Sequence, residues 1–242
     1  MEFYDQLAAD YDHMISFTDR LQKETVIFEN ILKRFPAGRI LDAGCGTGFH
    51  SIVLSSLERE VVGIDSSRKM IQQARKNARE FKASVKFIET DFLSLAEMKE
   101  GRFDAVFCLG NSFVHLLTAK QRLLVMKYFK RSLVPGGYVF LQLINYDKIL
   151  KEKSKILSVK TIEGRKYIRS YTYHASTVTF TLRIETATGS REISNEIYPL
   201  QSVELSRLAA RTGLTKMNWF GNLSLHEYDR YVSENICTVL SE

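Results

Sequence analysis

The sequence contains little of what marks small secreted or membrane proteins. Of its 242 residues only three are cysteine and three are proline, and it has no run of about 18 apolar residues that could span a bilayer. The odd number of cysteines, widely spaced and without a CxxC pair, argues against both a disulfide framework and a zinc site. We therefore expect three buried free thiols, no bound metal and no membrane span.

The amino terminus lacks the features of a signal peptide. The segment Met1–Asp5 is acidic and has no basic region followed by an apolar one, so the default expectation is a cytoplasmic location. The net charge of +6 comes from basic residues spread along the chain, and the densest basic group, residues 148–155, is interrupted by a glutamate. This distribution is typical of a solvated surface and disfavours nucleic acid as a partner, while the oligomeric state stays open.

Apolar strands alternate with helical segments over the first 143 residues. Strands are expected at 39–43, 60–65, 85–88, 103–109 and 138–143, the last after a turn at Pro135-Gly136-Gly137. Helices are expected at 18–34, 50–57, 66–81 and 118–133, with Ser66 or Ser67 as a cap. The alternation predicts an α/β fold with a Rossmann-like sheet, helices on both faces, and a ligand at the carboxyl ends of the strands.

The composition changes after Asn145. Threonine, tyrosine and isoleucine dominate four β-like runs separated by turns at Gly164 and Gly189, at residues 156–162, 166–173, 178–186 and 192–198. We interpret residues 146–199 as an antiparallel β insertion after the fifth strand, a lid or substrate platform over the strand ends. Residues 1–145 and 200–242, with a helix at 202–211 and strands at 214–220 and 230–240, would form the core.

The strongest single motif is the glycine turn Leu41-Asp42-Ala43-Gly44-Cys45-Gly46-Thr47-Gly48 after the first strand. Glycines there permit a sharp turn and close approach of a ligand. Phe49 stands where a dinucleotide fingerprint has its third glycine, which disfavours a nicotinamide cofactor. Asp65 ends the second strand and could accept ribose hydroxyls or simply cap a helix. Asp91 and Phe92 suit an adenine, although Asp91 also suits a turn.

Several segments together resemble the class I S-adenosylmethionine-dependent methyltransferases, across roughly residues 38–143. The segments are 40–48, 62–65, 90–92, 103–106 and 133–137. The resemblance implies S-adenosylmethionine as cofactor. It also implies cofactor contacts at Gly44 and Gly46, at Asp65 for the ribose, at Asp91 and Phe92 for the adenine, and at Met70, which would pack on the adenine or be an ordinary core residue.

Residues 108–116 and 145–150 are similar to the matching segments of glycine and sarcosine N-methyltransferases. This second resemblance implies that Leu109 contacts the cofactor and that Arg20 holds its carboxylate. Ile144 stands where those enzymes have an arginine for the substrate carboxylate, and an apolar side chain cannot replace a guanidinium. Glycine is therefore disfavoured as acceptor, and amino sugars, whose N-methyltransferases have a similar insertion, are the competing substrates.

The implied reaction is direct displacement of the activated methyl group by a small molecule, with an uncharged amine nitrogen as nucleophile. The enzyme would supply alignment and a dry site. His115 is a candidate general base or amine orienter, and Asn111 could hold the substrate through its amide. Tyr11, with Tyr4 in a stretch before the first helix, would close over the cofactor and orient the amine.

Three rival functions remain. A nucleic-acid methyltransferase is disfavoured because the loop Gly110-Asn111-Ser112-Phe113 lacks the two prolines that such enzymes use to hold a flipped base. A non-catalytic S-adenosylmethionine-binding protein is disfavoured by the presence of His115 and Asn111. A nicotinamide oxidoreductase is disfavoured by the spacing of the glycine turn.

Overall fold

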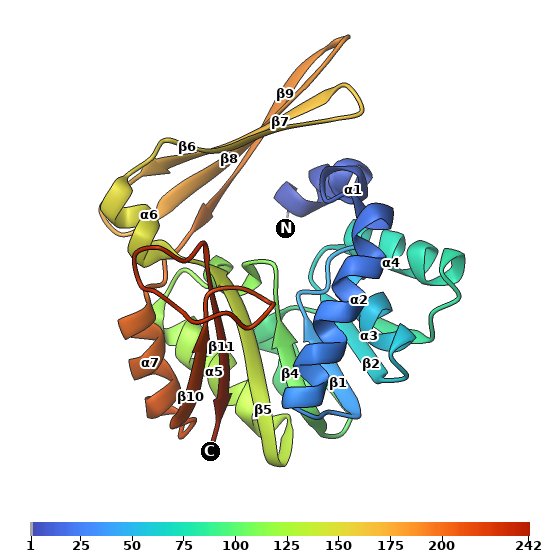
Figure 1. Cartoon of the computed structure of the whole chain (residues 1–242), viewed down its shortest axis with the longest axis vertical. Helices are drawn as coiled ribbons and strands as arrows, with labels where there is room; N and C mark the ends of the chain where they lie inside the picture. Colours follow the sequence, from blue (N-terminus) through green and yellow to red (C-terminus); the bar gives the residue numbers. More distant parts are fainter. Residues whose placement is uncertain (1) are drawn as a thin grey trace.

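A computed structural model describes residues 2–242, which form a seven-stranded sheet flanked by helices and a separate four-stranded sheet (Figure 1). The strand order of the large sheet is β10-β11-β5-β4-β1-β2-β3. Its strands are β1 (Arg39–Ala43), β2 (Glu60–Asp65), β3 (Val85–Glu89), β4 (Phe103–Cys108), β5 (Leu133–Ile144), β10 (Lys216–Phe220) and β11 (Asn235–Ser241). Only β11 runs against its neighbours, and β1 lies between β2 and β4. The carboxyl ends of β1, β2 and β4 therefore meet at one edge.

Helices cover both faces of this sheet, which confirms the predicted α/β class. One face packs against α2 (Phe17–Arg34), α3 (Phe49–Ser56) and α4 (Arg68–Glu80), through buried residues such as Phe28 and Ile71. The other packs against α5 (Ala119–Arg131) and α7 (Ser202–Arg211), through Phe129 and Leu205. Because both faces are buried, the central strands read as continuous apolar runs.

Two helix starts show why the sequence folds this way locally. The Ser67 hydroxyl accepts a hydrogen bond from the Met70 amide at 3.2 Å and caps α4. Thr118 and Gln121 form a reciprocal capping box at the start of α5. Each cap satisfies backbone donors that a helix end leaves unpaired, and the Ser67 cap agrees with the sequence expectation.

The predicted antiparallel insertion is present as the sheet β6-β7-β8-β9, which extends over the carboxyl edge of the large sheet (Figure 1). Its strands are β6 (Ile156–Ile162), β7 (Arg165–Tyr173), β8 (Val178–Thr186) and β9 (Gly189–Ile197). The short helix α6 (Tyr146–Glu152) connects it to β5, and Tyr146 at its start is buried in the main core. Side chains that alternate along β7 to β9 therefore face the core and solvent in turn.

The expectation that Tyr4 and Tyr11 precede the first helix is wrong, because both lie within helix α1 (Glu2–Met14). The reason is tertiary packing. Phe3 and Leu7 on one face of α1 are buried in a cluster with Met70 of α4 and with residues of the insertion, Tyr167, Leu182, Ile184 and Ile193. The helix is thus held between the core and the insertion, and its own sequence gives only a modest apolar stripe.

The expected turn at Pro135-Gly136-Gly137 is also wrong, because these residues lie inside β5. The pairing of β4 with β5 shifts register between Phe103 and Ala105, so the segment forms a strand irregularity. A Cβ at Gly137 would lie 2.8 Å from the Asp104 carbonyl oxygen, which explains a glycine where the strands approach closely.

Cys45, Cys108 and Cys237 are free and buried, in agreement with the prediction. Within residues 2–242, no cluster of three or more His, Cys, Asp or Glu side chains is arranged to hold a metal ion. Over the same residues, every helix is too short or too polar to cross a bilayer.

Two glycines with left-handed backbone provide a matched test of this packing. Gly48 has φ +83°, and an added Cβ would lie 2.8 Å from the Phe87 ring. Gly136 has φ +80° and open space around its Cα. We expect Gly136→Ala to lower the free energy of unfolding by about 1–2 kcal/mol through backbone strain, and Gly48→Ala to lose roughly 1–3 kcal/mol more through overpacking. Urea unfolding measures both, and equal losses would contradict the packing argument.

Candidate active site

The glycine turn is fastened to the end of β2 by backbone hydrogen bonds. The amides of Gly44 and Cys45 both donate to the Ile64 carbonyl oxygen, at 2.8 and 2.9 Å. The Gly48 amide donates to the Cys45 carbonyl at 2.9 Å, and α3 begins immediately afterwards. The turn therefore lies at the carboxyl edge of β1 and β2, where parallel sheets bind ligands.

Asp65 joins the two strand ends. One carboxylate oxygen accepts from the Gly46 amide and the other from the Ser67 amide, each at 2.9 Å. Burial raises the pKa of Asp65, and these two hydrogen bonds oppose that rise. Each oxygen keeps lone pairs for a further donor, so the half-buried carboxylate can accept two hydroxyls of a ribose.

The three glycines of the turn differ in how closely other side chains approach them. An added Cβ at Gly44 would lie 2.7 Å from the Ser112 side chain, and at Gly48 it would strike Phe87. At Gly46, whose φ is +55°, the nearest group is the Tyr11 ring at 3.9 Å. Packing within the chain thus accounts for Gly44 and Gly48. At Gly46 an added Cβ would make only ordinary contact with the Tyr11 ring, so its positive φ, and not crowding, is what favours a glycine there.

The other predicted cofactor residues lie around this turn at different depths. Phe92, in the 3-10 helix η1 (Phe92–Glu97), approaches to within 3.3 Å of the Cβ position of Gly44. Leu109 is buried just beyond β4. Asp91 is exposed and caps η1 by accepting from the Ser94 amide at 2.8 Å, and Met70 is fully buried beneath α1. Their roles toward the cofactor stay predictions.

Arg20 brings a positive charge to the start of α3. Its guanidinium lies 4.7 Å from the centre of the Phe49 ring, and it donates to Glu24 at 2.9 Å and to the Ile15 carbonyl at 3.4 Å. Burial and the nearby positive charge of Arg20 together lower the pKa of His50 to about 3. A cofactor carboxylate beside the glycine turn would meet this charge.

His115 connects three separate parts of the chain. It ends the 3-10 helix η2 (Ser112–His115) after β4, and its Nε2 hydrogen-bonds the Tyr4 hydroxyl of α1 at 2.7 Å. Its Nδ1 faces the amide nitrogen of Asn195 on β9 at 3.1 Å. Burial lowers the pKa of His115 to about 4, so the imidazole is neutral at pH 7.

Asn111 uses both ends of its amide within the protein. Its nitrogen donates to the Tyr146 hydroxyl at 2.8 Å, and its oxygen accepts from the Ile144 amide at 3.0 Å. The Tyr146 hydroxyl in turn lies 3.3 Å from that of Tyr171. The side chain of Asn111 thus fixes the end of β5 and the first turn of α6, which is the geometry of a positioning residue.

Asn195 and Tyr146 were not among the residues that the sequence singled out. The period-two burial of β9 could have indicated that Asn195 faces inward with Ile193 and Ile197. No local signal marks Tyr146, because its partners Asn111 and Tyr171 come from distant segments.

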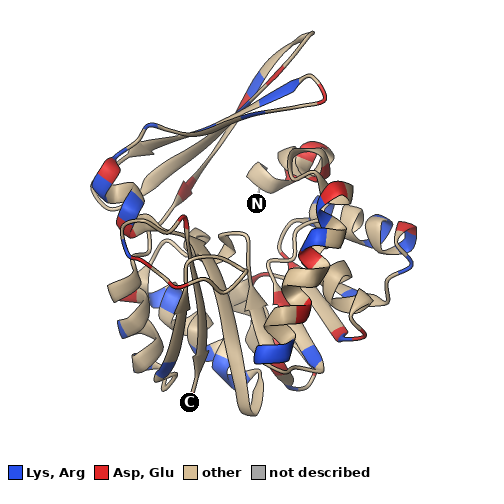
Figure 2. Cartoon of the chain, in the orientation of Figure 1, with Lys and Arg blue, Asp and Glu red and all other residues tan. Residues whose placement is uncertain are grey.

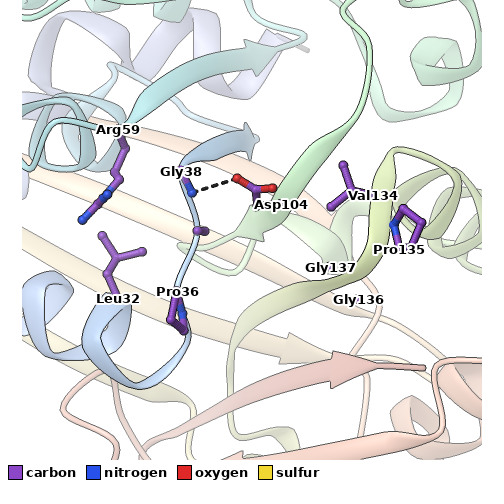
Figure 3. Close-up of a pocket in the computed structure, with 10 residues that line it drawn as sticks. Leu32, Pro36, Gly38, Arg59, Asp104, Val134, Pro135, Gly136 and Gly137 are labelled. Atoms are coloured by element: carbon purple, nitrogen blue, oxygen red, sulfur yellow. Dashed lines mark hydrogen bonds between the residues drawn. The ribbon is translucent and has the colours of Figure 1, made fainter.

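A different pocket lies at the opposite, amino-terminal edge of the sheet (Figure 3). It has a volume of about 430 Å³, and Arg59, Asp104 and Gly136 are among the residues that line it. Asp104 is occupied there as a structural acceptor for the Gly38 amide at 2.8 Å and the Arg39 amide at 2.7 Å. The residues discussed above all lie at the other edge, where the carboxyl ends of the strands meet.

Comparison with known proteins decides the family. A model of the methyltransferase domain matches residues 40–137. The glycine/sarcosine N-methyltransferase of Halorhodospira halochloris is 32% identical over 223 residues, which cover 91% of this chain and 82% of that protein. The chain belongs to the S-adenosylmethionine-dependent methyltransferases.

Solved structures show that this methyltransferase has a shared fold. The CcbJ methyltransferase of Streptomyces caelestis superposes with a TM-score of 0.81 at 20% identity, covering 99% of this chain and 97% of that one. CalS10, an amino pentose methyltransferase of Micromonospora echinaspora solved with S-adenosylmethionine bound, gives a TM-score of 0.68 at 20% identity, with 97% and 95% coverage. Both comparisons include the β insertion, which is therefore part of the common architecture.

The cofactor assignment of this methyltransferase can be tested on two matched carboxylates. Asp65 and Asp104 each accept two backbone amides, at opposite edges of the sheet. We expect Asp65→Ala to weaken S-adenosylmethionine binding by roughly 100-fold or more, since two hydrogen bonds to a charged acceptor are lost. Asp104→Ala should affect stability alone. Isothermal titration calorimetry measures both, and near-normal affinity of Asp65→Ala would overturn the ribose assignment.

The buried Asp42 predicts a pH-dependent stability. Its carboxylate accepts from the Ser51 hydroxyl at 2.6 Å, and burial raises its pKa from 3.8 to about 6. Between these values the folded protein holds a proton that the unfolded chain has lost, so stability falls as pH rises through this window. The full loss above pH 6 is roughly 3 kcal/mol.

We therefore expect Asp42→Asn, which stays neutral, to be more stable than the parent protein at pH 7.5 and equally stable near pH 4. Ser51→Ala should move the window to higher pH, because the hydroxyl stabilises the charged form. Urea unfolding at a series of pH values measures the difference. A difference that stays constant over pH would show that Asp42 does not titrate in this range.

Proposed function

We propose that this methyltransferase transfers a methyl group to the amino nitrogen of a small molecule, held between the glycine turn, α1 and the inner face of the insertion. The observation that carries the proposal is the neutral His115, hydrogen-bonded to Tyr4 and Asn195 above the carboxyl edge. The names of the relatives, which are N-methyltransferases of glycine, sarcosine and amino sugars, support an amine acceptor. When bound, S-adenosylmethionine supplies a methyl group already activated by its sulfonium charge.

The residues around Asp65 fit that cofactor. The carboxylate has free lone pairs for two hydroxyls, and the Gly46 amide and the Tyr11 phenol lie near it. Arg20 would hold the carboxylate of the methionine end, in place of part of its present contact with Glu24. Phe92 and Leu109 would pack on the adenosine side, with Gly44, Met70 and Asp91 completing the enclosure.

The low pKa of His115 defines what this side chain can do. A group with a pKa of about 4 is a weak base, and it cannot hold the proton of an ammonium ion, whose pKa is several units higher. The amine therefore has to enter uncharged, its proton being lost to water. His115 then acts by holding Tyr4 in place. Because both side chains are neutral, neither places a positive charge beside the sulfonium.

Tyr4 and Tyr11 lie two helical turns apart on α1 and face the same side. Burial raises the pKa of both phenols, so both stay protonated. With the Asn195 amide donating to Nδ1, the ring proton lies on Nε2 and is donated to the Tyr4 oxygen. That oxygen keeps a lone pair with which to accept an amine N–H and direct the nitrogen lone pair.

Charge is distributed unevenly over the chain. Acidic and basic segments alternate along α2 (Figure 2), whereas the insertion carries four basic residues and no acidic one between Glu163 and Glu185. Ile144, half-buried against the main core, provides no charge at the end of β5. We therefore propose an acceptor other than glycine.

The role of His115 can be tested by its replacement. We expect His115→Ala to lower kcat with a small amine by roughly 100-fold, the effect of misplacing one hydrogen-bonding group, while the Kd for S-adenosylmethionine changes little. The parent kcat/KM should rise with pH up to the pKa of the amine and show no inflection near 6.5. Formation of S-adenosylhomocysteine from a panel of amines is the assay.

The matched control is His226→Ala, an exposed histidine that bonds only to Asn222 and should leave turnover unchanged. An inflection near pH 6.5 that disappears in His115→Gln would show instead that His115 is a base with an ordinary pKa. Tight cofactor binding without turnover of any amine would favour a non-catalytic protein.

A further inference from the structure

Along β7 to β9 the inner face of the insertion is mostly apolar and carries four charged or amide side chains. The strand register shows which residues of β7, β8 and β9 share this face. Tyr171 pairs with Phe180, and Phe180 pairs with Asn195. Arg169 pairs with Leu182. Tyr171 and Leu182 are buried against the core and α1. The charged or amide members are Arg165, Arg169, Arg191 and Asn195.

Three of these four side chains have partners. Arg165 and Arg191 form ion pairs with Asp10 of α1, and Asn195 bonds to His115. Arg169 lies between Tyr167 and Tyr171 on the inward face of β7 and is only half exposed. Among the side chains that the structure describes, those of residues 3–242, no hydrogen bond or ion pair reaches its guanidinium, although a guanidinium has five N–H donors.

No carboxylate of residues 3–242 pairs with Arg169. Its electrostatic neighbours are the phenols of Tyr11 and Tyr171 and the cation of Arg20, and burial lowers its pKa. The carboxylates of this region are engaged elsewhere: Asp5 with Ser67, Asp10 with Arg165 and Arg191, Asp12 with Gln73 and Asn77, Glu24 with Arg20, and Asp65 with backbone amides. A half-buried, uncompensated arginine is unfavourable unless a ligand completes it.

This position is adjacent to the proposed acceptor space. Tyr171, two residues along the same face of β7, touches Tyr146, which follows Ile144 by two residues. Ile144 provides no positive charge at the end of β5, and Arg169 of the insertion provides one nearby. Tyr11, on the other side of Arg169, is the residue that faces Gly46.

We propose that Arg169 binds an anionic group, a carboxylate or a phosphate, on the amine acceptor, and so determines substrate specificity. The proposal rests on the function proposed above, because it assigns the second half of the same acceptor. It differs from the role of Arg20, which lies at the glycine turn and would hold the cofactor. A planar guanidinium suits either oxyanion through two parallel hydrogen bonds.

The test compares amines with and without an anionic group. The pairs are β-alanine and propylamine, phosphoethanolamine and ethanolamine, and glucosamine 6-phosphate and glucosamine, each assayed by S-adenosylhomocysteine formation. We expect the anionic member of a pair to have the higher kcat/KM, with the first pair reporting a carboxylate and the others a phosphate. Arg169→Gln should raise KM for that acceptor roughly 10- to 100-fold, and Arg169→Lys should raise it less.

Arg183→Gln is the control, because Arg183 lies on the outer face of the same sheet, opposite Ile168, and pairs with Glu185. It should leave KM unchanged. A second readout does not need turnover: calorimetry of acetate and of inorganic phosphate with the S-adenosylhomocysteine complex, in which Arg169→Gln should weaken binding about tenfold.

The outcomes separate the two proposals. Equal use of neutral and anionic amines, with unchanged anion binding in Arg169→Gln, overturns the anion site and leaves amine methylation standing. Weaker cofactor binding in Arg169→Gln with unchanged acceptor KM would assign Arg169 to the cofactor and overturns the proposal. If anion binding depends on Arg169 but no amine is turned over, the anion site is supported and the proposed function is contradicted.

Discussion

Helix α1 is held on two sides, and the active-site geometry depends on this clamp. Toward the core, Asp5 accepts from the Ser67 hydroxyl at 2.5 Å at the start of α4. Toward the insertion, Asp10 pairs with Arg165 and Arg191 of β7 and β9. Apolar residues of α1 fill the space between these contacts. Because Tyr4 and Tyr11 belong to α1, the clamp sets where both phenols lie relative to the glycine turn and to His115.

The same enclosure explains the electrostatics of the site. Burial raises the pKa of Tyr4 and Tyr11 and lowers that of His115, so the groups proposed to lie nearest the acceptor are neutral at pH 7. Charge remains at the margins, on Asp65 beside the turn and on Arg20 and Arg169. A dry, uncharged centre suits a reaction in which a neutral amine meets a cationic methyl donor, since it leaves the sulfonium charge unscreened.

The sequence predicted the sheet almost strand by strand, because central parallel strands and capped helices have recognisable patterns in the local sequence. It failed at α1, whose helical state depends on contacts with Met70 and the insertion, and at Pro135-Gly136-Gly137, where a strand irregularity looks like a turn. At the site, the glycine turn and Asp65 carry local patterns. His115 bonds to Tyr4, which is 111 positions away in the sequence, and to Asn195, which is 80 positions away. Local periodicity cannot predict such pairs.

Much of the proposed acceptor site lies outside the segment matched by the methyltransferase-domain model, although His115 lies within it. The methyltransferase domain match ends at residue 137, before Ile144, Tyr146 and the whole insertion. The residues proposed to bind the donor come from that matched segment, with Arg20 outside it. The proposed acceptor wall includes α1 and β7 to β9, with Ile144 at the end of β5 and Arg169 on β7. Two members of this family can therefore share a cofactor site and differ in substrate without any change in the sheet.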